Sequence, residues 1–179
     1  MLVERGDVNP NQTIDTYGQT PLLWAARKGR SEVVKMLLER GDVNPDQVDT
    51  EYGLTPLLCA ALNGYSEVVK ILLERGDINP DQADSKYGRT PLSWAAENGH
   101  SEVVKMLLER GGVNPDRADT ENGRTPLSCA AFNGHSEVVE MLLARGDVNP
   151  NQADTIYDLT PLSWATFSGH SEVVKMLLV

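Results

Sequence analysis

A block of 35 residues recurs along the whole chain and limits the folds that the chain can adopt. The tripeptide Thr-Pro-Leu begins at Thr20, Thr55, Thr90, Thr125 and Thr160. The segment Ser-Glu-Val-Val recurs at the same interval, and no change of composition marks a linker between blocks. Each block carries too little apolar surface for a core of its own, so it must stack on its neighbours. The repeat therefore predicts one continuous solenoid.

The block 90–124 predicts two short helices followed by a long loop. Thr90 is a favoured N-cap, and Pro91 suits the first helical position because no N–H is needed there. We expect Ser101 to cap a second helix, whose apolar residues follow at positions i, i+1, i+4 and i+5 on one face. Gly111 ends that helix, and turn-forming residues lead from it to the next Thr-Pro.

These blocks resemble the ankyrin repeat, whose elements appear here as TPLSWAA, NGHSEVV, KMLL and RGDVN. The resemblance recurs in all five units and covers essentially the whole chain. It implies an all-α stack of helix-turn-helix units in which loop fingers and first helices form a concave, protein-binding face. The Gly-Asp-Val-Asn-Pro loop and the TPLSWAA helix also resemble the ankyrin tails of fungal NACHT-type immune-receptor-like proteins.

The loops depart from the family pattern. Eight residues, Pro45 to Tyr52, separate Asn44 from Gly53, and the period is 35 rather than the usual 33 or so. We therefore expect a longer finger than in standard ankyrin repeats. The histidine that the family places after Thr-Pro-Leu is also replaced, by Leu23, Leu58, Ser93, Ser128 and Ser163.

The phase of the repeat divides the chain. We expect a single array, 1–179, that starts and stops within second helices. Because neither end is a polar capping repeat, we expect apolar end surfaces through which the protein self-associates. The units are a partial repeat end and finger at 1–19, full repeats at 20–54, 55–89, 90–124 and 125–159, and a truncated repeat at 160–179.

The net charge of −10 makes binding to nucleic acid or to an anionic membrane unfavourable. Nearly all of this charge lies in the loops, which favours a protein partner with a basic surface. No apolar run reaches the roughly 18 residues of a membrane span, and the first residues do not resemble a signal peptide. Cys59 and Cys129 lie two repeats apart, too far for a disulfide, so we expect free thiols and an intracellular, cytoplasmic protein.

No arrangement of residues predicts an enzyme, a cofactor or a metal site. His100, His135 and His170 lie in separate stacked repeats, so they cannot share a metal ion, and we expect each to bond to local backbone. Serines and carboxylates recur as caps and turn residues rather than as a catalytic group. Arg-Gly-Asp recurs where second helices end, so we interpret it as a helix stop rather than an adhesion signal. It occurs at Arg5, Arg40, Arg75 and Arg145.

Candidate contact residues lie where the repeats differ from one another. One position of the first helix alternates between two residue types, as Trp24, Cys59, Trp94, Cys129 and Trp164. The tryptophans can be buried against the neighbouring first helix, or can act as anchors at the edge of the concave face. Phe132 and Phe167 are expected to form an apolar patch. The candidate partner-binding residues are Trp24, Glu51, Tyr52, Lys86, Tyr87, Arg89, Trp94, Asn122, Arg124, Phe132, Tyr157, Trp164 and Phe167.

Two functions remain open from the sequence. The first is a protein–protein interaction module that binds through first helices and acidic fingers. The second is a structural or spacer array, or a consensus-like scaffold without a dedicated partner. The near-identity of the repeats favours the second, whereas the aromatic residues at variable positions favour the first.

Overall fold

A computed structural model describes residues 8–179 of the protein. The predicted helix end at 1–7, with the first Arg-Gly-Asp at Arg5, lies outside the described residues. The described part contains ten α-helices and no strand, which confirms the predicted all-α fold. The helices are α1 (Pro21–Arg27), α2 (Ser31–Leu38), α3 (Pro56–Leu62), α4 (Ser66–Leu73), α5 (Pro91–Glu97), α6 (Ser101–Glu109), α7 (Pro126–Asn133), α8 (Ser136–Leu143), α9 (Pro161–Phe167) and α10 (Ser171–Leu177).

Helix starts follow the predicted pattern in the first helices but not in the second. Thr90 Oγ1 accepts a hydrogen bond from the backbone N–H of Ser93, and Pro91 is the first residue of α5. The other four first helices begin in the same way, each at a Thr-Pro pair. The prediction that Ser101 caps α6 is wrong, because α6 begins at Ser101 and its N-cap His100 makes no side-chain capping bond. The histidine ring has another role.

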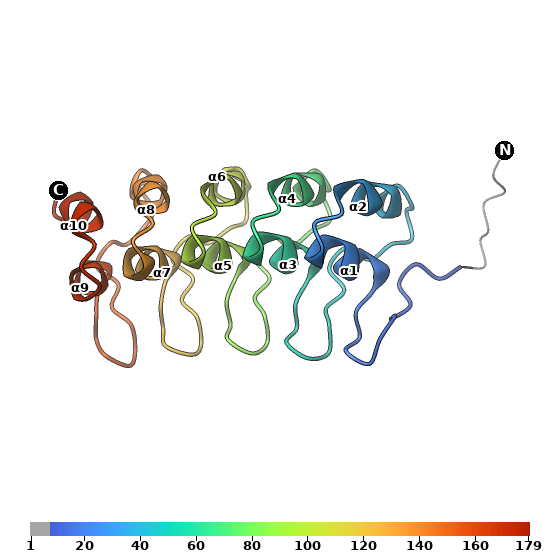
Figure 1. Ribbon diagram of the computed structural model, residues 1–179, viewed down its shortest axis with the longest axis horizontal. Coiled ribbons are helices and arrows are strands. Elements are labelled where there is room, and N and C mark those ends of the chain that lie inside the picture. The colour runs from blue at the N-terminus through green and yellow to red at the C-terminus, as the bar shows by residue number, and fades with distance from the viewer. Residues whose placement is uncertain (1–7) are drawn as a thin grey trace.

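The helices form two parallel rows, and Figure 1 shows the loops extending beyond the row of first helices, away from the second helices. We call residues 8–19, 41–54, 76–89, 111–124 and 146–159 the fingers. Each first helix packs on the next one along the row, and each second helix does the same. Leucine, valine and alanine side chains from both rows form one continuous core, in which Leu57, Leu92 and Leu127 are fully buried. The burial of a shared core makes each repeat depend on its neighbours.

Histidines join consecutive repeats across the turn between paired helices. His100 Nε2 donates to the carbonyl oxygen of Leu62, at 3.1 Å, and His135 Nε2 donates to that of Glu97 at 2.9 Å. The expectation of a bond to local backbone was therefore wrong, because the acceptor belongs to the preceding repeat. The imidazole of His100 lies against Gly64, where an added Cβ would be 2.5 Å from its Nδ1. This contact and the positive φ of 70° require glycine at that position.

The Arg-Gly-Asp segments close the second helices, as predicted. Arg75 forms an ion pair with Asp77, and its Nη1 donates to the carbonyl oxygen of Leu38 at the end of the preceding second helix. The hydrogen bond from Arg75 lowers the pKa of Asp77. Arg145 repeats both contacts, with Asp147 and with the carbonyl of Leu108. The arginines therefore satisfy carbonyl groups that a helix end leaves without an internal donor.

Candidate functional site

A buried aspartate folds the tip of each complete finger. Asp84 Oδ1 accepts from the backbone N–H of Lys86 at 3.0 Å and of Tyr87 at 2.6 Å. Asp154 accepts from two backbone N–H groups in the same way. Burial acts to raise the pKa of Asp154, but the N–H groups of Tyr157 and Ile156 and the Trp164 indole outweigh it, and the pKa is lowered. These hydrogen bonds hold the finger backbone in a fixed turn.

Consecutive fingers are hydrogen-bonded to one another. The backbone N–H of Ser85 donates to the carbonyl of Tyr52, and that of Thr120 donates to the carbonyl of Tyr87, both at 2.8 Å. The close approach requires glycine at the tip, since a Cβ on Gly88 would lie 2.5 Å from Thr120 Cγ2. The fingers therefore form a connected sheet-like surface next to the first helices. We call the surface formed by the first helices and the fingers the inner face.

The tryptophans of the first helices are held by the finger aspartates. Trp94 Nε1 donates to Asp84 Oδ2 at 2.9 Å, and Trp164 Nε1 donates to Asp154 Oδ2 at 2.8 Å. Each pair is separated by ten residues in the sequence. In the first finger the aspartate is displaced by one residue, to Asp15, and Trp24 remains 43 % exposed. The expectation of burial against the neighbouring helix therefore holds for Trp164, which is 5 % exposed, and not for Trp24.

A groove of about 270 Å³ opens on the inner face above Cys59, where the first helix carries no tryptophan. Its sides are aromatic: Tyr87 and Trp94 meet edge to face, with ring centroids 6.0 Å apart. Lys86 Nζ lies 4.6 Å from the ring centroids of both Tyr52 and Tyr87 at the finger side. We call this the open groove. Its lining residues are Arg27, Tyr52, Leu54, Cys59, Leu62, Asn63, Asp84, Lys86, Tyr87 and Trp94.

A second hollow, of about 410 Å³, adjoins the open groove and shares Arg27 and Tyr52 with it. Trp24 lies in its lining, with the ammonium group of Lys28 5.1 Å from its ring centroid. Gln19 also lines it, is 2 % exposed and leaves its Oε1 without a hydrogen-bond partner. The inner face is thus hollowed continuously across its first three fingers.

The equivalent place 70 residues later is filled. Arg124, which replaces Leu54, places its guanidinium 4.0 Å from the ring centroid of Trp164. Phe132, which replaces Leu62, meets Trp164 edge to face at 5.2 Å, and Arg124 also covers Phe132 at 4.9 Å. We call this the filled copy. Its aromatic cluster continues to Tyr157 and Phe167, each 5.9 Å from Trp164, so Phe132 and Phe167 contact the same indole.

Arg89 occupies the corresponding slot between these two places. It forms ion pairs with Glu97, Asp119 and Glu121, and only 7 % of it is exposed. Burial acts to lower the pKa of its guanidinium, but Glu97 and the other nearby anions outweigh burial and raise it. Arg89 also lies 4.7 Å from the ring centroid of Trp94, on which it stacks. Its donors face the protein interior, so it supports Trp94 and the fingers.

The predicted contact residues therefore divide by exposure. Trp24, Glu51, Lys86, Tyr157 and Phe167 are exposed. The half-buried residues are Tyr52, Tyr87, Trp94, Asn122, Arg124 and Phe132. Arg89 and Trp164 are buried, so they can position other groups but offer almost no surface to a partner.

Sequence reasoning missed several residues that line the open groove. Arg27, Leu54 and Leu62 vary among the repeats, and that variation was the signal that could have found them. An aspartate stands at the position of Asp84 in every full finger, so a search for variable positions did not select it. The ten-residue spacing between Asp84 and Trp94 would have indicated the bond that connects finger and helix.

Both cysteines are free and buried, as predicted. Cys59 lies at the bottom of the open groove with 1 % exposed, and Cys129 is 2 % exposed. Burial raises the pKa of each thiol to about 12. Neither thiol is a nucleophile near neutral pH, because only the thiolate reacts.

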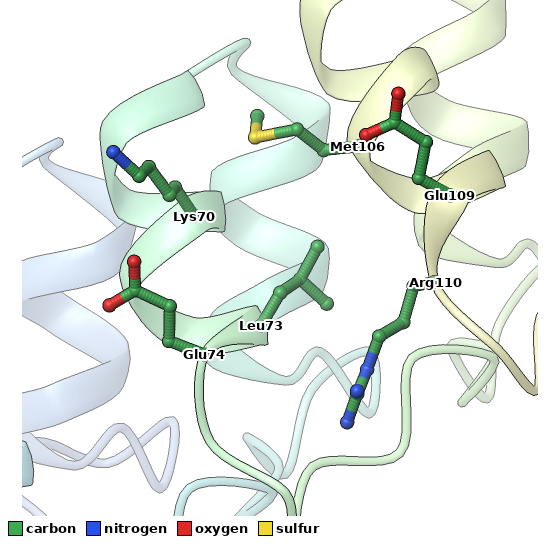
Figure 2. Close-up of a pocket in the computed structure, with 6 residues that line it drawn as sticks. All are labelled: Lys70, Leu73, Glu74, Met106, Glu109 and Arg110. Carbon is green, nitrogen blue, oxygen red and sulfur yellow. The ribbon is translucent and has the colours of Figure 1, made fainter.

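Smaller grooves between the second helices are products of the repeat itself. Figure 2 shows Leu73 of α4 and Met106 of α6 facing one groove of about 220 Å³, with Lys70 and Glu109 beside it. A groove with equivalent lining residues recurs between α6 and α8. Five of the six lining residues recur 35 residues later, with Ala144 in place of Glu109, so these grooves follow from the repeat itself, unlike the open groove.

Among residues 8–179, no group of three or more His, Cys, Asp or Glu side chains could hold a metal ion. No helix in the same range is long and apolar enough to cross a membrane.

Two family models match the sequence. The model described as ankyrin repeats (3 copies) matches residues 42–119 and 111–179, and the model described as ankyrin repeat matches residues 17–50. No curated protein matches the chain. The matched ranges cover most of the sequence and include all five first helices, in agreement with the two rows of helices and the fingers. The chain therefore belongs to the ankyrin repeat family.

Proposed function

We propose that the protein binds a protein partner on its inner face, with the open groove as the centre of the contact. Ankyrin repeats are generally protein–protein interaction modules, and they are generally non-enzymatic. The observation that carries this proposal is the groove of about 270 Å³ walled by Tyr52, Tyr87 and Trp94. Aromatic side chains in a partly buried depression are the commonest anchors of protein interfaces.

The rest of the inner face supports the same assignment. Trp24 and Phe167 expose large apolar surfaces, 43 % and 76 % of each residue, on either side of the groove. Exposed aromatic residues in such positions are typical of contact sites. Buried Arg89 and Trp164 act as supports that fix the neighbouring side chains before a partner arrives. A rigid surface loses less conformational entropy on binding.

The charge of the fingers favours a partner whose overall surface is basic. The net charge of −10 attracts such a surface over a distance and so raises the rate of association. We expect the association rate to fall as salt is added, because salt screens charges beyond about 10 Å at 0.1 M. Free, buried thiols support an intracellular, reducing location.

A variant that fills the open groove with the side chains of the filled copy tests the proposal. The variant Leu54→Arg/Leu62→Phe introduces the residues found at 124 and 132, which the fold already accommodates. A random peptide library displayed on phage is selected against the full chain. Binding of the selected peptides should fall at least tenfold, about 1.4 kcal/mol, in this variant. Lys105→Gln, on the second-helix side, should leave it unchanged.

The alternative function gives a different result. A spacer or scaffold without a partner would yield no peptide whose binding depends on the open groove. Equal binding to the wild type and to Leu54→Arg/Leu62→Phe would therefore contradict the proposal and favour a scaffold.

Self-association is a second candidate, supported by the outer surface of α2. Val33 and Met36 are 46 % and 67 % exposed, whereas Val68 and Val103, which correspond to Val33, are buried. A second copy could cover this apolar surface. Sedimentation velocity should then show a mass that rises with concentration and falls again in Val33→Lys. A constant monomer mass would contradict self-association.

A further inference from the structure

We infer that the open groove receives an acidic side chain, Asp or Glu, of the protein partner. This inference rests on the proposed function and specifies the group that the groove recognises. It depends on which charged groups near the groove are already paired within the fold and which are not.

The carboxylates around the groove are engaged inside the protein. Asp84 accepts two backbone N–H groups with Oδ1 and the Trp94 indole with Oδ2, which leaves it little capacity for a ligand. Glu51 is engaged as well, since a hydrogen bond to its side chain is the main cause that raises the pKa of the Tyr52 hydroxyl. Asp84 is therefore a structural group, and the exposed carboxylate of Glu51 is shared with the Tyr52 hydroxyl.

The cations around the groove have no carboxylate at ion-pair distance among the described residues. Arg27 and Lys86 both line it, from the end of α1 and from the finger 76–89. Within residues 8–179, Arg27 forms no ion pair with a carboxylate, and Lys86 contacts the rings of Tyr52 and Tyr87, with a hydrogen bond to Tyr87 and the negative charge of Glu51 near it. Both side chains are exposed, and the groove between them has Cys59 as part of its apolar floor. A carboxylate in the groove would gain two charge-assisted contacts.

The filled copy shows that this charge pattern is specific to the open groove. The residues equivalent to Arg27 and Lys86 are Glu97 and Ile156, so neither cation is repeated there. Its only groove cation, Arg124, is stacked on Phe132 and Trp164. Of these two places, only the open groove therefore combines two cations, Arg27 and Lys86, with an unfilled hollow that has aromatic walls.

The net negative charge of the chain does not conflict with this inference. Many finger aspartates are bonded to backbone N–H groups or to arginines, as Asp46 is to Asn79 and Asp77 is to Arg75. The finger aspartates determine how a partner approaches from a distance, whereas Arg27 and Lys86 determine which side chain enters the groove. A partner with a basic surface and one acidic anchor satisfies both.

A peptide selection with a double-mutant cycle tests the inference. Random peptides on phage are selected against the full wild-type chain, and one enriched peptide is synthesised with its acidic residue intact or changed to the amide. Affinities are measured by fluorescence anisotropy for the wild type and for Arg27→Gln/Lys86→Gln. Lys70→Gln/Lys105→Gln is the matched control, because it removes the same charge from the second-helix side.

We expect enrichment of Asp or Glu at one peptide position, and an at least tenfold loss of affinity when that residue becomes an amide. The loss should disappear in Arg27→Gln/Lys86→Gln and persist in Lys70→Gln/Lys105→Gln. Peptides that lose binding in Leu54→Arg/Leu62→Phe but need no acidic residue would overturn this inference and leave the proposed function in place. If no peptide is sensitive to Leu54→Arg/Leu62→Phe, both are overturned.

Discussion

The open groove and the filled copy lie 70 residues apart on the same framework, yet only one of them can receive a side chain. Both have a small cysteine below, a tryptophan at the side and an aspartate that fixes the indole. Among the lining positions that differ, two account for the filling: Leu54 and Leu62 in the open groove correspond to Arg124 and Phe132 in the filled copy.

This difference shows how a repeat array can gain a binding site without changing its fold. Most residues that cap helices or fill the core, such as Thr90 and Leu92, recur in every unit, because each stack depends on them. Side chains that only cover the inner face are free to vary, and two of them decide whether the surface is hollow. The groove therefore exists because two side chains that could fill it are smaller in this repeat than in the filled copy.

The largest effect should come from the tryptophans of the two places. Trp164 is buried among Arg124, Tyr157, Phe132 and Phe167, so Trp164→Ala should destabilise the protein by about 3–5 kcal/mol. Trp94 faces the open groove, and Trp94→Ala should cost clearly less. Guanidinium unfolding followed by circular dichroism measures both. Equal losses would show that the open groove is closed in solution.

The finger contacts should give the next largest effect. Gly88 has a φ of 68°, and a Cβ there would meet Thr120, so Gly88→Ala should destabilise the protein by about 2–3 kcal/mol. Gly76 has open space around its Cα and provides the control, for which Gly76→Ala should have little effect. Similar unfolding midpoints for the two variants would contradict the finger-to-finger packing.

The fold could be predicted from the sequence because its causes are local and repeated. Thr90 and Pro91 start a helix through their own chemistry, and the apolar stripe of 103–108 requires a neighbour to cover it. The role of Ser101 could not be predicted in the same way, since capping also depends on the backbone geometry before the helix. His100 bonds to the carbonyl of Leu62, a contact between repeats that sequence spacing does not reveal.

The candidate site could be predicted only in part. The aromatic residues of the fingers and first helices indicated Tyr52, Tyr87 and Trp94, which the structure brings together in the groove lining. It did not separate surface residues from buried ones, because the ion pairs that bury Arg89 join residues up to 32 positions apart. The open groove could not be predicted, because its volume depends on how several side chains pack together rather than on any single residue.

Opening the filled copy should have a smaller effect and would sharpen the comparison directly. Arg124→Leu/Phe132→Leu gives it the residues of the open groove at these two positions, removes the contacts above Trp164, and should cost about 1–2 kcal/mol. The fluorescence emission of Trp164 should shift to longer wavelength as water reaches it. To observe Trp164 alone, Trp24→Phe/Trp94→Phe is introduced both with and without Arg124→Leu/Phe132→Leu. An unchanged spectrum would show that other side chains fill the place.

The two thiols should respond alike to alkaline pH, although one lies under the open groove. Each folded pKa is raised to about 12, above the ordinary value near 9. The neutral thiol is therefore favoured by folding, and this stability is complete below pH 9 and lost as the pH rises towards 12. The loss should be about 1 kcal/mol per thiol at pH 10. Cys59→Ala and Cys129→Ala should each remove an equal part of this alkaline loss in the free energy of unfolding. A thiol that iodoacetamide alkylates rapidly in the folded protein at pH 8 would contradict its burial.

The smallest effect should come from Asp158, the residue of the filled copy that corresponds to Gly88. Its φ is 55°, in the left-handed region that disfavours a Cβ. Asp158→Gly relieves this strain but adds freedom to the unfolded chain, so we expect a stabilisation of only about 0.5 kcal/mol. Asp158→Asn removes the charge and keeps a residue that tolerates this conformation, so it should leave the unfolding midpoint unchanged. If the two variants stabilise the protein equally, charge repulsion rather than backbone strain distinguishes Asp158 from Gly88.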